Sequence, residues 1–163
     1  MHEIINKLPK LVKDKHKENK VFFNKLKKRP PKQLDYLMQD LHDNEFQSTD
    51  CLKCANCCKT TGPLFTDKDI RRISKYLKLK TKQFIENYLR LDEEDDYVLN
   101  TLPCVFLGED NFCSIYEVRP KACSEFPHTN RKKFYQITNL TLKNMTICPA
   151  AYNIVEALKK NVK

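Results

Sequence analysis

The chain has 163 residues, a formal net charge of +9 and 40% hydrophobic residues, a composition typical of one globular domain with or without an extension. It holds only two glycines, and neither of the glycine-rich loops that cradle nucleotide phosphates is present. Lys and Arg dominate residues 1–32, 51–90 and 119–163, whereas Asp and Glu dominate residues 33–50 and 91–118. Because acidic blocks interrupt the basic ones, we expect packed segments to neutralise each other and do not expect nucleic acid to be the partner.

Residues 1–50 contain no cysteine and are predicted to form an N-terminal helical extension. Apolar residues recur at helical spacing over residues 4–28, and the stable part of this helix is expected to begin at Pro9, because proline suits the first helical turn. After a break, a second helix is expected from Pro31 to Asp43. The extension would serve as a lid, as a hairpin that covers the core, or as a partner surface.

Residues 51–163 are predicted to form a cysteine-cluster metal-binding domain, which begins with a segment dense in thiols. Four of the eight cysteines fall in this segment: Cys51, Cys54, Cys57 and Cys58. Each C-x-x-C step lets one tight turn point two sulfurs at a common centre, and the segment takes that step twice. Adjacent side chains leave the backbone in different directions, so Cys58 is expected to serve a second centre or to pack as a thiol.

Eight cysteines are compatible with metal binding or with disulfides, so the compartment decides between them. The first residues lack the apolar core of a secretion signal, and no run of about 18 apolar residues is present that would span a membrane. These features predict a soluble cytoplasmic protein without a membrane partner. Thiols stay reduced in the cytosol, where clustered cysteines usually bind metal, and a disulfide framework is the alternative.

Downstream of the cysteine segment, helices are expected to start at Thr66, where Asp69 is placed to complete a capping box, and at Thr81. The acidic run 92–96 is expected to be an exposed loop. Residues 104–116 are expected to form a short β-hairpin that brings the remaining loop cysteines, Cys104 and Cys113, near each other.

A short helical turn is expected after Pro120, and it would carry Cys123. Residues 131–147 are ambiguous between helix and strand. Cys148 and Pro149 are expected to open a last helix. The predicted fold class is therefore mainly α with a small β-hairpin, stabilised by metal.

The order of these pieces resembles the YkgJ-type cysteine-cluster family, whose members are named for a CxxCxxCC motif and described as zinc- or iron-chelating. The matching pieces are Cys51-x-x-Cys54-x-x-Cys57-Cys58, Cys104-Val105-Phe106-Leu107, Cys113-Ser114-Ile115-Tyr116-x-x-Arg119-Pro120-x-x-Cys123-x-x-Phe126-Pro127 and Cys148-Pro149. Residues 1–50 lie outside the resemblance. Flagellin lysine methylases carry a related cysteine pattern, for which an iron–sulfur cluster is the implied cofactor. The resemblance thus implies a metal and leaves the reaction open.

Zinc and a [4Fe–4S] cluster both fit sites made of four thiolates. The ferredoxin-type spacing of the first three cysteines and the Cys148-Pro149 pair favour the cluster, whereas Cys58 is not needed by that spacing. A first centre is predicted from one set of ligands: Cys51, Cys54, Cys57 and Cys148. The other set would form a second site or a buried group of thiols: Cys58, Cys104, Cys113 and Cys123.

Two classes of function follow from these ligands. The first is a metal-binding carrier or accessory partner of another enzyme, with an unidentified protein as its partner. It is favoured because the sequence supplies ligands without a visible nucleophile–base pair or cofactor loop. The alternatives are an iron–sulfur enzyme of protein modification, by analogy with the lysine methylases, and a zinc-stabilised nucleic-acid-binding module. The sequence leaves open whether the protein is an enzyme.

Overall fold

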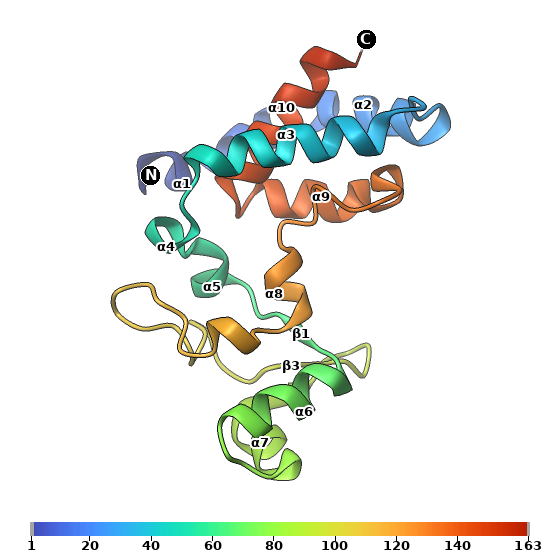
Figure 1. The fold of residues 1–163 in the computed structure, drawn as a ribbon. Coiled ribbons are helices and arrows are strands. Elements are labelled where there is room, and N and C mark those ends of the chain that lie inside the picture. Colours follow the sequence, from blue (N-terminus) through green and yellow to red (C-terminus); the bar gives the residue numbers. More distant parts are fainter. Residues whose placement is uncertain (1, 163) are drawn as a thin grey trace. The chain divides into compact units, whose positions relative to one another are not determined.

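The structure is a computed structural model that describes residues 2–162, with side chains described from residue 4 onward (Figure 1). It is mainly α-helical, as predicted. The longer helices are α1 (His2–Asp14), α2 (His16–Lys28), α3 (Leu34–Ser48), α6 (Asp67–Tyr76), α7 (Thr81–Tyr88), α9 (Thr138–Met145) and α10 (Pro149–Asn161). The short helices are α4 (Cys51–Cys54), α5 (Asn56–Thr60), η1 (Tyr116–Val118), α8 (Lys121–Glu125) and η2 (Phe134–Ile137). The strands are β1 (Leu64–Phe65), β2 (Leu89–Leu91) and β3 (Tyr97–Leu99).

The chain divides into two compact units. Unit 1 combines the residues up to Cys54 with those from Pro127 onward, and unit 2 is Ala55–Phe126. The helices of residues 2–48 therefore share unit 1 with the C-terminal helices. The sequence predicted one domain over residues 1–50 and another over residues 51–163. This division stays a prediction, and its residues 1 and 163 lie outside the described part of the chain.

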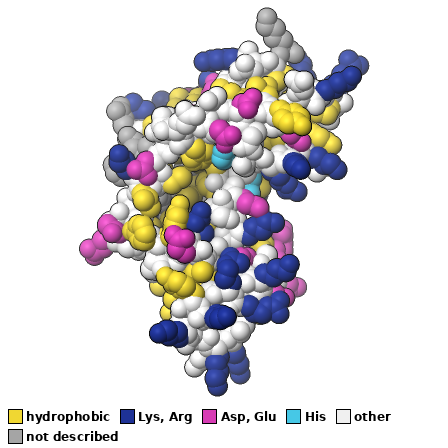
Figure 2. Space-filling view, viewed as in Figure 1, with side chains coloured by type: hydrophobic (Ala, Val, Ile, Leu, Met, Phe, Trp, Pro, Cys, Tyr) yellow, Lys and Arg dark blue, Asp and Glu magenta, His cyan; other side chains and the backbone are white. Residues whose placement is uncertain are grey.

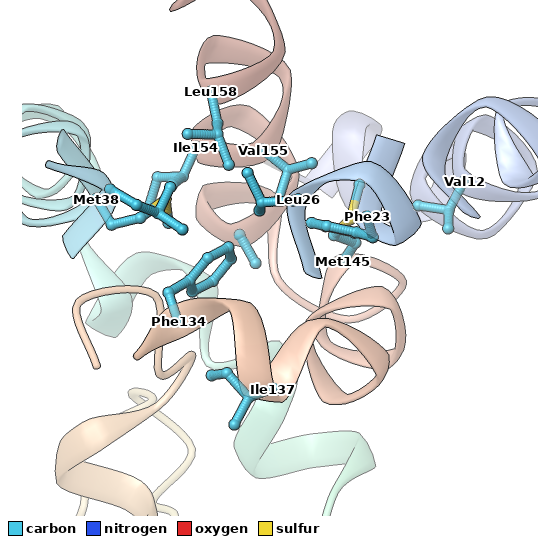
Figure 3. Close-up of a cluster of buried hydrophobic side chains, with 12 residues drawn as sticks. Val12, Phe23, Leu26, Met38, Phe134, Ile137, Met145, Ile154, Val155 and Leu158 are labelled. Atoms are coloured by element: carbon cyan, nitrogen blue, oxygen red, sulfur yellow. The ribbon is translucent and has the colours of Figure 1, made fainter. Parts of the chain in front are cut away.

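The core of unit 1 is built from its N-terminal and C-terminal helices together. Helix α10 packs against α3, α9 and α1. Figure 3 shows Met38, Leu26, Phe134 and Ile154 pointing toward one another from four different elements. The Asp35 carboxylate accepts hydrogen bonds from the amides of Lys133 and Phe134, at 2.7 and 3.2 Å, and so fastens the start of η2 to α3.

The N-terminal helices differ from the prediction. The second helix, expected from Pro31 to Asp43, is α3 and runs from Leu34 to Ser48. The helix expected over residues 4–28 is two helices, because the chain breaks at Lys15 between α1 and α2. Pro9 lies inside α1, which begins seven residues earlier at His2, so the expected start at Pro9 is wrong. Burial of Leu8 and Val12 on one face of α1 supplies the packing that holds this helix together around the proline.

Unit 2 has a core of its own between α6, α7 and a three-stranded antiparallel sheet of order β1-β3-β2. Phe84 of α7 is fully buried, and the rings of Phe65, Tyr88 and Phe106 surround it. The acidic run 92–96 is the turn that joins β2 to β3, so a small β-hairpin is present at this point of the chain.

The hairpin expected over residues 104–116 is reduced to a single antiparallel bridge between Leu107 and Cys113. Residues 131–147, which the sequence left ambiguous, are helical and form η2 and α9. Phe134 and Ile137 are buried in the unit 1 core, and this tertiary packing outweighs the preference of such residues for strands.

The surface carries charge of both signs. On the face drawn in Figure 2, Lys and Arg side chains lie among Asp and Glu side chains instead of forming one unbroken basic surface. Within residues 2–162, no helix combines the length and the apolar character that crossing a membrane requires.

Candidate metal centre

No disulfide joins any of the eight cysteines, all of which lie in the described part of the chain. Cys51 is exposed, and the other seven are half-buried. Unit 1 contains Cys51, Cys54 and Cys148, and unit 2 contains the remaining five. The disulfide framework considered from the sequence is therefore absent, and the thiols are available as ligands.

The CxxCxxCC segment folds as two short helices. Helix α4 ends at Cys54, α5 begins at Asn56, and Ala55 between them has a φ of 46°, in the left-handed region that non-glycine residues rarely occupy. This reversal at Ala55 interrupts what would otherwise be one continuous helix. Each C-x-x-C pair consequently has its own turn.

Within α5, the Sγ atoms of Cys57 and Cys58 lie 4.0 Å apart. Two thiolates on one tetrahedral zinc ion, with Zn–S bonds of about 2.3 Å, lie roughly 3.8 Å apart. The two sulfurs thus lie close together, although adjacent side chains leave the backbone in different directions. Their separation is compatible with a shared metal, and direction alone does not assign them to different centres.

Unit 2 brings the loop of Cys104 and Cys113 to the same segment. The Cys104 amide donates to the Cys58 carbonyl oxygen at 2.9 Å. Between the two loop cysteines, the Gly108 amide donates to the Phe112 carbonyl at 2.8 Å, and a Cβ at Gly108 would meet the Asp110 carboxylate at 2.7 Å. The glycine thus leaves room for the Asp110 carboxylate, which approaches the backbone closely here.

Cys123 in α8 interacts with the other thiols of unit 2. Burial, together with smaller effects of negative charge on Cys58, Cys104 and Cys113, raises the pKa of the Cys123 thiol to about 12. Burial also raises the pKa values of Cys104 and Cys113. Four thiols of unit 2, which come from three separate stretches of chain, are therefore within electrostatic reach of one another.

Cys58 differs from these neighbours. A hydrogen bond from the Cys57 thiol lowers the pKa of Cys58 to about 7, and the positive charge of Lys59 acts in the same direction against the effect of burial. In the metal-free protein, Cys58 is therefore the thiol in this group that most readily forms the thiolate, which is the nucleophile and the metal ligand.

In unit 1, Cys148 is the N-cap of α10, and its Sγ accepts a hydrogen bond from the Ala151 amide at 3.5 Å. Pro149 occupies the first helical turn, as predicted. Burial, together with smaller effects of negative charge on Cys51 and Cys54, raises the pKa of Cys148 to about 12. Cys148, remote in sequence, is thus within electrostatic reach of the first C-x-x-C pair.

The thiols of each group lie in the same unit, but their sulfur atoms do not surround a common point. Among residues 4–162, no set of three or more His, Cys, Asp or Glu side chains is arranged tightly enough to hold a metal ion in the positions that they occupy. The structure thus groups Cys51, Cys54 and Cys148 in one unit, and it gathers Cys58, Cys104, Cys113 and Cys123 around Cys57 in the other.

Arg119 and Tyr116 lie beside the second group. The Arg119 guanidinium stacks on the Tyr116 ring at 4.0 Å from its centroid and donates to the Tyr116 carbonyl at 2.7 Å. Its charge lowers the pKa values of Cys113 and Cys123 against the dominant effect of burial. The position of these two residues beside the thiols is consistent with a role in supporting a metal site.

This arrangement defines a class: a small helical protein in which cysteines from several stretches of chain are gathered to bind metal. The chain belongs to the CxxCxxCC family, described as a "Putative zinc- or iron-chelating domain", which matches residues 50–146. Metal binding through the cysteines is therefore the established part of the function. Cys148 lies just beyond the matched residues.

A relative from Methanocaldococcus jannaschii bears the name "Uncharacterized protein MJ0661" and is 33% identical over 82 residues. The match covers 48% of this chain and 44% of that protein, so the chain corresponds to less than half of the relative's length. No solved structure matches the chain.

Proposed function

We propose that the protein holds metal in two sets of thiols and serves another enzyme as a carrier or accessory partner. The first set is Cys51, Cys54, Cys57 and Cys148, and the second is Cys58, Cys104, Cys113 and Cys123. The observation that carries this proposal is the grouping of the second set within unit 2, where burial and mutual charge act on the same thiols. Four thiols are the complete donor set of a structural zinc ion or of an iron–sulfur cluster.

The first set rests on two arguments. Cys148 lies within electrostatic reach of Cys51 and Cys54 in unit 1, which supports a shared centre for these three. Cys57 is added from the sequence alone, because a second C-x-x-C step follows directly after the first. The fourth ligand would then come from the N-terminus of α10, whose Pro149 fixes the backbone beside the thiol.

For the first set we propose a [4Fe–4S] cluster, and zinc is the competing metal. The C-x-x-C-x-x-C spacing with a remote Cys-Pro pair is the spacing of ferredoxin-type clusters. The residues fit either group, because none of the donors is in a disulfide and thiolates suit both iron–sulfur clusters and zinc. A bound cluster would supply reversible electron transfer. The chain itself supplies the ligands, the burial around Cys148 and the positive charge of Arg119 near the second set.

An accessory role is supported by the surface next to the second set. Several large apolar side chains on the cysteine loop are exposed by 40–51%: Leu102, Val105, Phe112 and Tyr116. Single exposed apolar residues are ordinary, but a concentration of them in one segment marks surfaces that bind other proteins. A protein that docks on this loop would approach Cys104 and Cys113 directly, as transfer of a metal or an electron requires.

The test is purification of the full chain without oxygen, followed by assays for iron, zinc and acid-labile sulfide and by visible absorption. We expect a brown protein with equal amounts of iron and sulfide, and loss of both in a Cys51→Ser/Cys54→Ser variant. A colourless wild-type protein with stoichiometric zinc and no sulfide would overturn the cluster and keep the metal-holding role. A protein that binds neither metal after reconstitution would overturn the metal-holding role as well.

A further inference from the structure

The carboxylate of Asp69 in α6 has more partners than a helix cap needs. It accepts from the Thr66 amide and hydroxyl at 3.0 and 2.6 Å, which completes the capping box expected from the sequence. It also accepts from the Lys121 amide at 3.1 Å and from the Arg72 guanidinium at 2.6 Å. Asp69 is only 1% exposed, so its charge is buried among these four donors.

Arg72 extends the connection to the same distant segment. Its Nη2 donates to the Arg119 carbonyl at 2.8 Å as well as to Asp69, and its Nε lies 3.4 Å from the Val118 carbonyl. Helix α6 therefore contacts the backbone of residues 118–121 at three points, through Asp69 and Arg72, which lie one helical turn apart.

Residues 118–121 lie between two cysteines of the second set, Cys113 and Cys123. On one side, the Tyr116 amide donates to the Cys113 carbonyl at 3.0 Å. On the other side, the Cys123 amide donates to the Pro120 carbonyl at 2.9 Å, so α8 begins directly at the point that Asp69 holds. The position of the Cys123 thiol thus follows from where α6 fixes Lys121.

We propose that Asp69 and Arg72 are positioning residues for the second metal set, because they hold the Arg119–Lys121 turn from which α8 carries the Cys123 thiol within unit 2. This inference rests on the proposed second set of ligands. Substitution of residues that orient metal ligands typically lowers metal affinity by roughly 10-fold to 100-fold. Asp69 and Arg72 would act only through backbone groups and would not touch the metal.

The test uses the full chain with cobalt(II) as the probe, since charge-transfer absorption from thiolate to cobalt reports how many thiolates bind the ion. Arg72→Gln is the main variant, because its side chain is 42% exposed and its loss leaves no buried charge except Asp69 with three remaining donors. Arg71→Gln is the matched control, which makes the same change of charge on an exposed neighbour in the same helix. Thr66→Ala is a second control: it weakens the cap of α6 and removes one of the four donors to Asp69, while the Lys121 amide and Arg72 remain as donors.

Arg72→Gln and Asp69→Asn are expected to weaken cobalt binding at the second set by roughly tenfold, with a spectrum that moves toward that of Cys123→Ser. Arg71→Gln and Thr66→Ala are expected to keep the wild-type spectrum. Circular dichroism shows whether each variant is folded, and if Asp69→Asn does not fold, Arg72→Gln alone decides.

Equal spectra and affinities for wild type and folded Arg72→Gln would overturn the inference and leave the second set intact. Equal weakening by Arg72→Gln and Thr66→Ala would overturn it too, because the effect would then be general loss of helix stability. If Cys58→Ser, Cys104→Ser and Cys123→Ser all bind cobalt as the wild type does, the proposed second set is itself wrong and the inference falls with it.

Discussion

The backbone amide of Cys104 donates a hydrogen bond to the carbonyl oxygen of Cys58, with 2.9 Å between the nitrogen and the oxygen. Two pieces of the motif that are distant in sequence are thereby joined through their main chains inside unit 2. Their registration does not depend on the side chains that would bind metal. The fold therefore brings these two cysteines to one region before a metal binds. This lowers the conformational-entropy cost of metal binding.

Removal of the metal is expected to loosen residues 104–116 while α10 stays ordered. The loop is held by a few backbone hydrogen bonds and one β-bridge, whereas α10 buries Ile154, Val155 and Leu158 in the core of unit 1. Structural metal contributes on the order of 10 kcal/mol to the folding free energy of small domains. When the metal is removed, the least packed segment is expected to lose the most order. Hydrogen exchange of the full chain before and after anaerobic chelation measures this. Equal protection of the loop amides in both states would show that the metal does not hold the loop.

Cys58 is expected to be alkylated before Cys123 and Cys148 in the metal-free protein at neutral pH. A hydrogen bond from Cys57 lowers the Cys58 pKa to about 7, and burial raises the other two to about 12. The rate for Cys58 should rise as the pH increases through about 7, since the thiolate is the reactive form, and fall below it. Peptide mass spectrometry after brief iodoacetamide treatment gives the order.

Cys57→Ala is the matched variant for that experiment. It removes the hydrogen bond that is the largest cause of the lowered Cys58 pKa, so the reaction of Cys58 at pH 7 should slow toward that of an ordinary thiol. An unchanged rate, or a rate for Cys148 equal to that of Cys58, would contradict the assigned electrostatics.

Phe84→Ala is expected to destabilise unit 2 by about 3–5 kcal/mol. The side chain is fully buried, and the rings of Tyr88, Phe65 and Phe106 lie 5.3, 6.1 and 6.3 Å from its own, so the substitution leaves a cavity that the neighbours cannot fill. Tyr76→Ala, on a side chain that is 51% exposed in the same unit, should change stability by less than about 0.5 kcal/mol. Denaturant unfolding of the two variants measures the difference, and similar midpoints would place the core of unit 2 elsewhere.

The helices that the sequence predicted well are those with local signals. Thr66 and Asp69 mark the start of α6 and form the expected capping box, and Cys148-Pro149 opens α10 as expected. The sheet was missed because its strands have only two or three residues, which is too short for an alternating pattern to appear. The break at Lys15 carries no proline or glycine and was equally invisible.

The candidate site divides in the same way. All eight cysteines were identified as candidate ligands, because the residue type and its spacing are visible in the sequence. Which thiols lie together was not predictable in this way, as the 4.0 Å between Cys57 and Cys58 shows. The second task of Asp69 was also hidden, since a carboxylate that caps its own helix gives no sign of the distant Lys121 amide that it binds.

Counting the metal bound by three single variants tests most directly whether the cysteines form two separate sets. Metal and sulfide per chain are measured in anaerobically purified Cys57→Ser, Cys58→Ser and Cys148→Ser. We predict that Cys57→Ser and Cys148→Ser lose the first centre, and that Cys58→Ser keeps it and loses the second. Full metal content in Cys148→Ser together with loss of the first centre in Cys58→Ser would contradict the two sets and assign both neighbours, Cys57 and Cys58, to one metal.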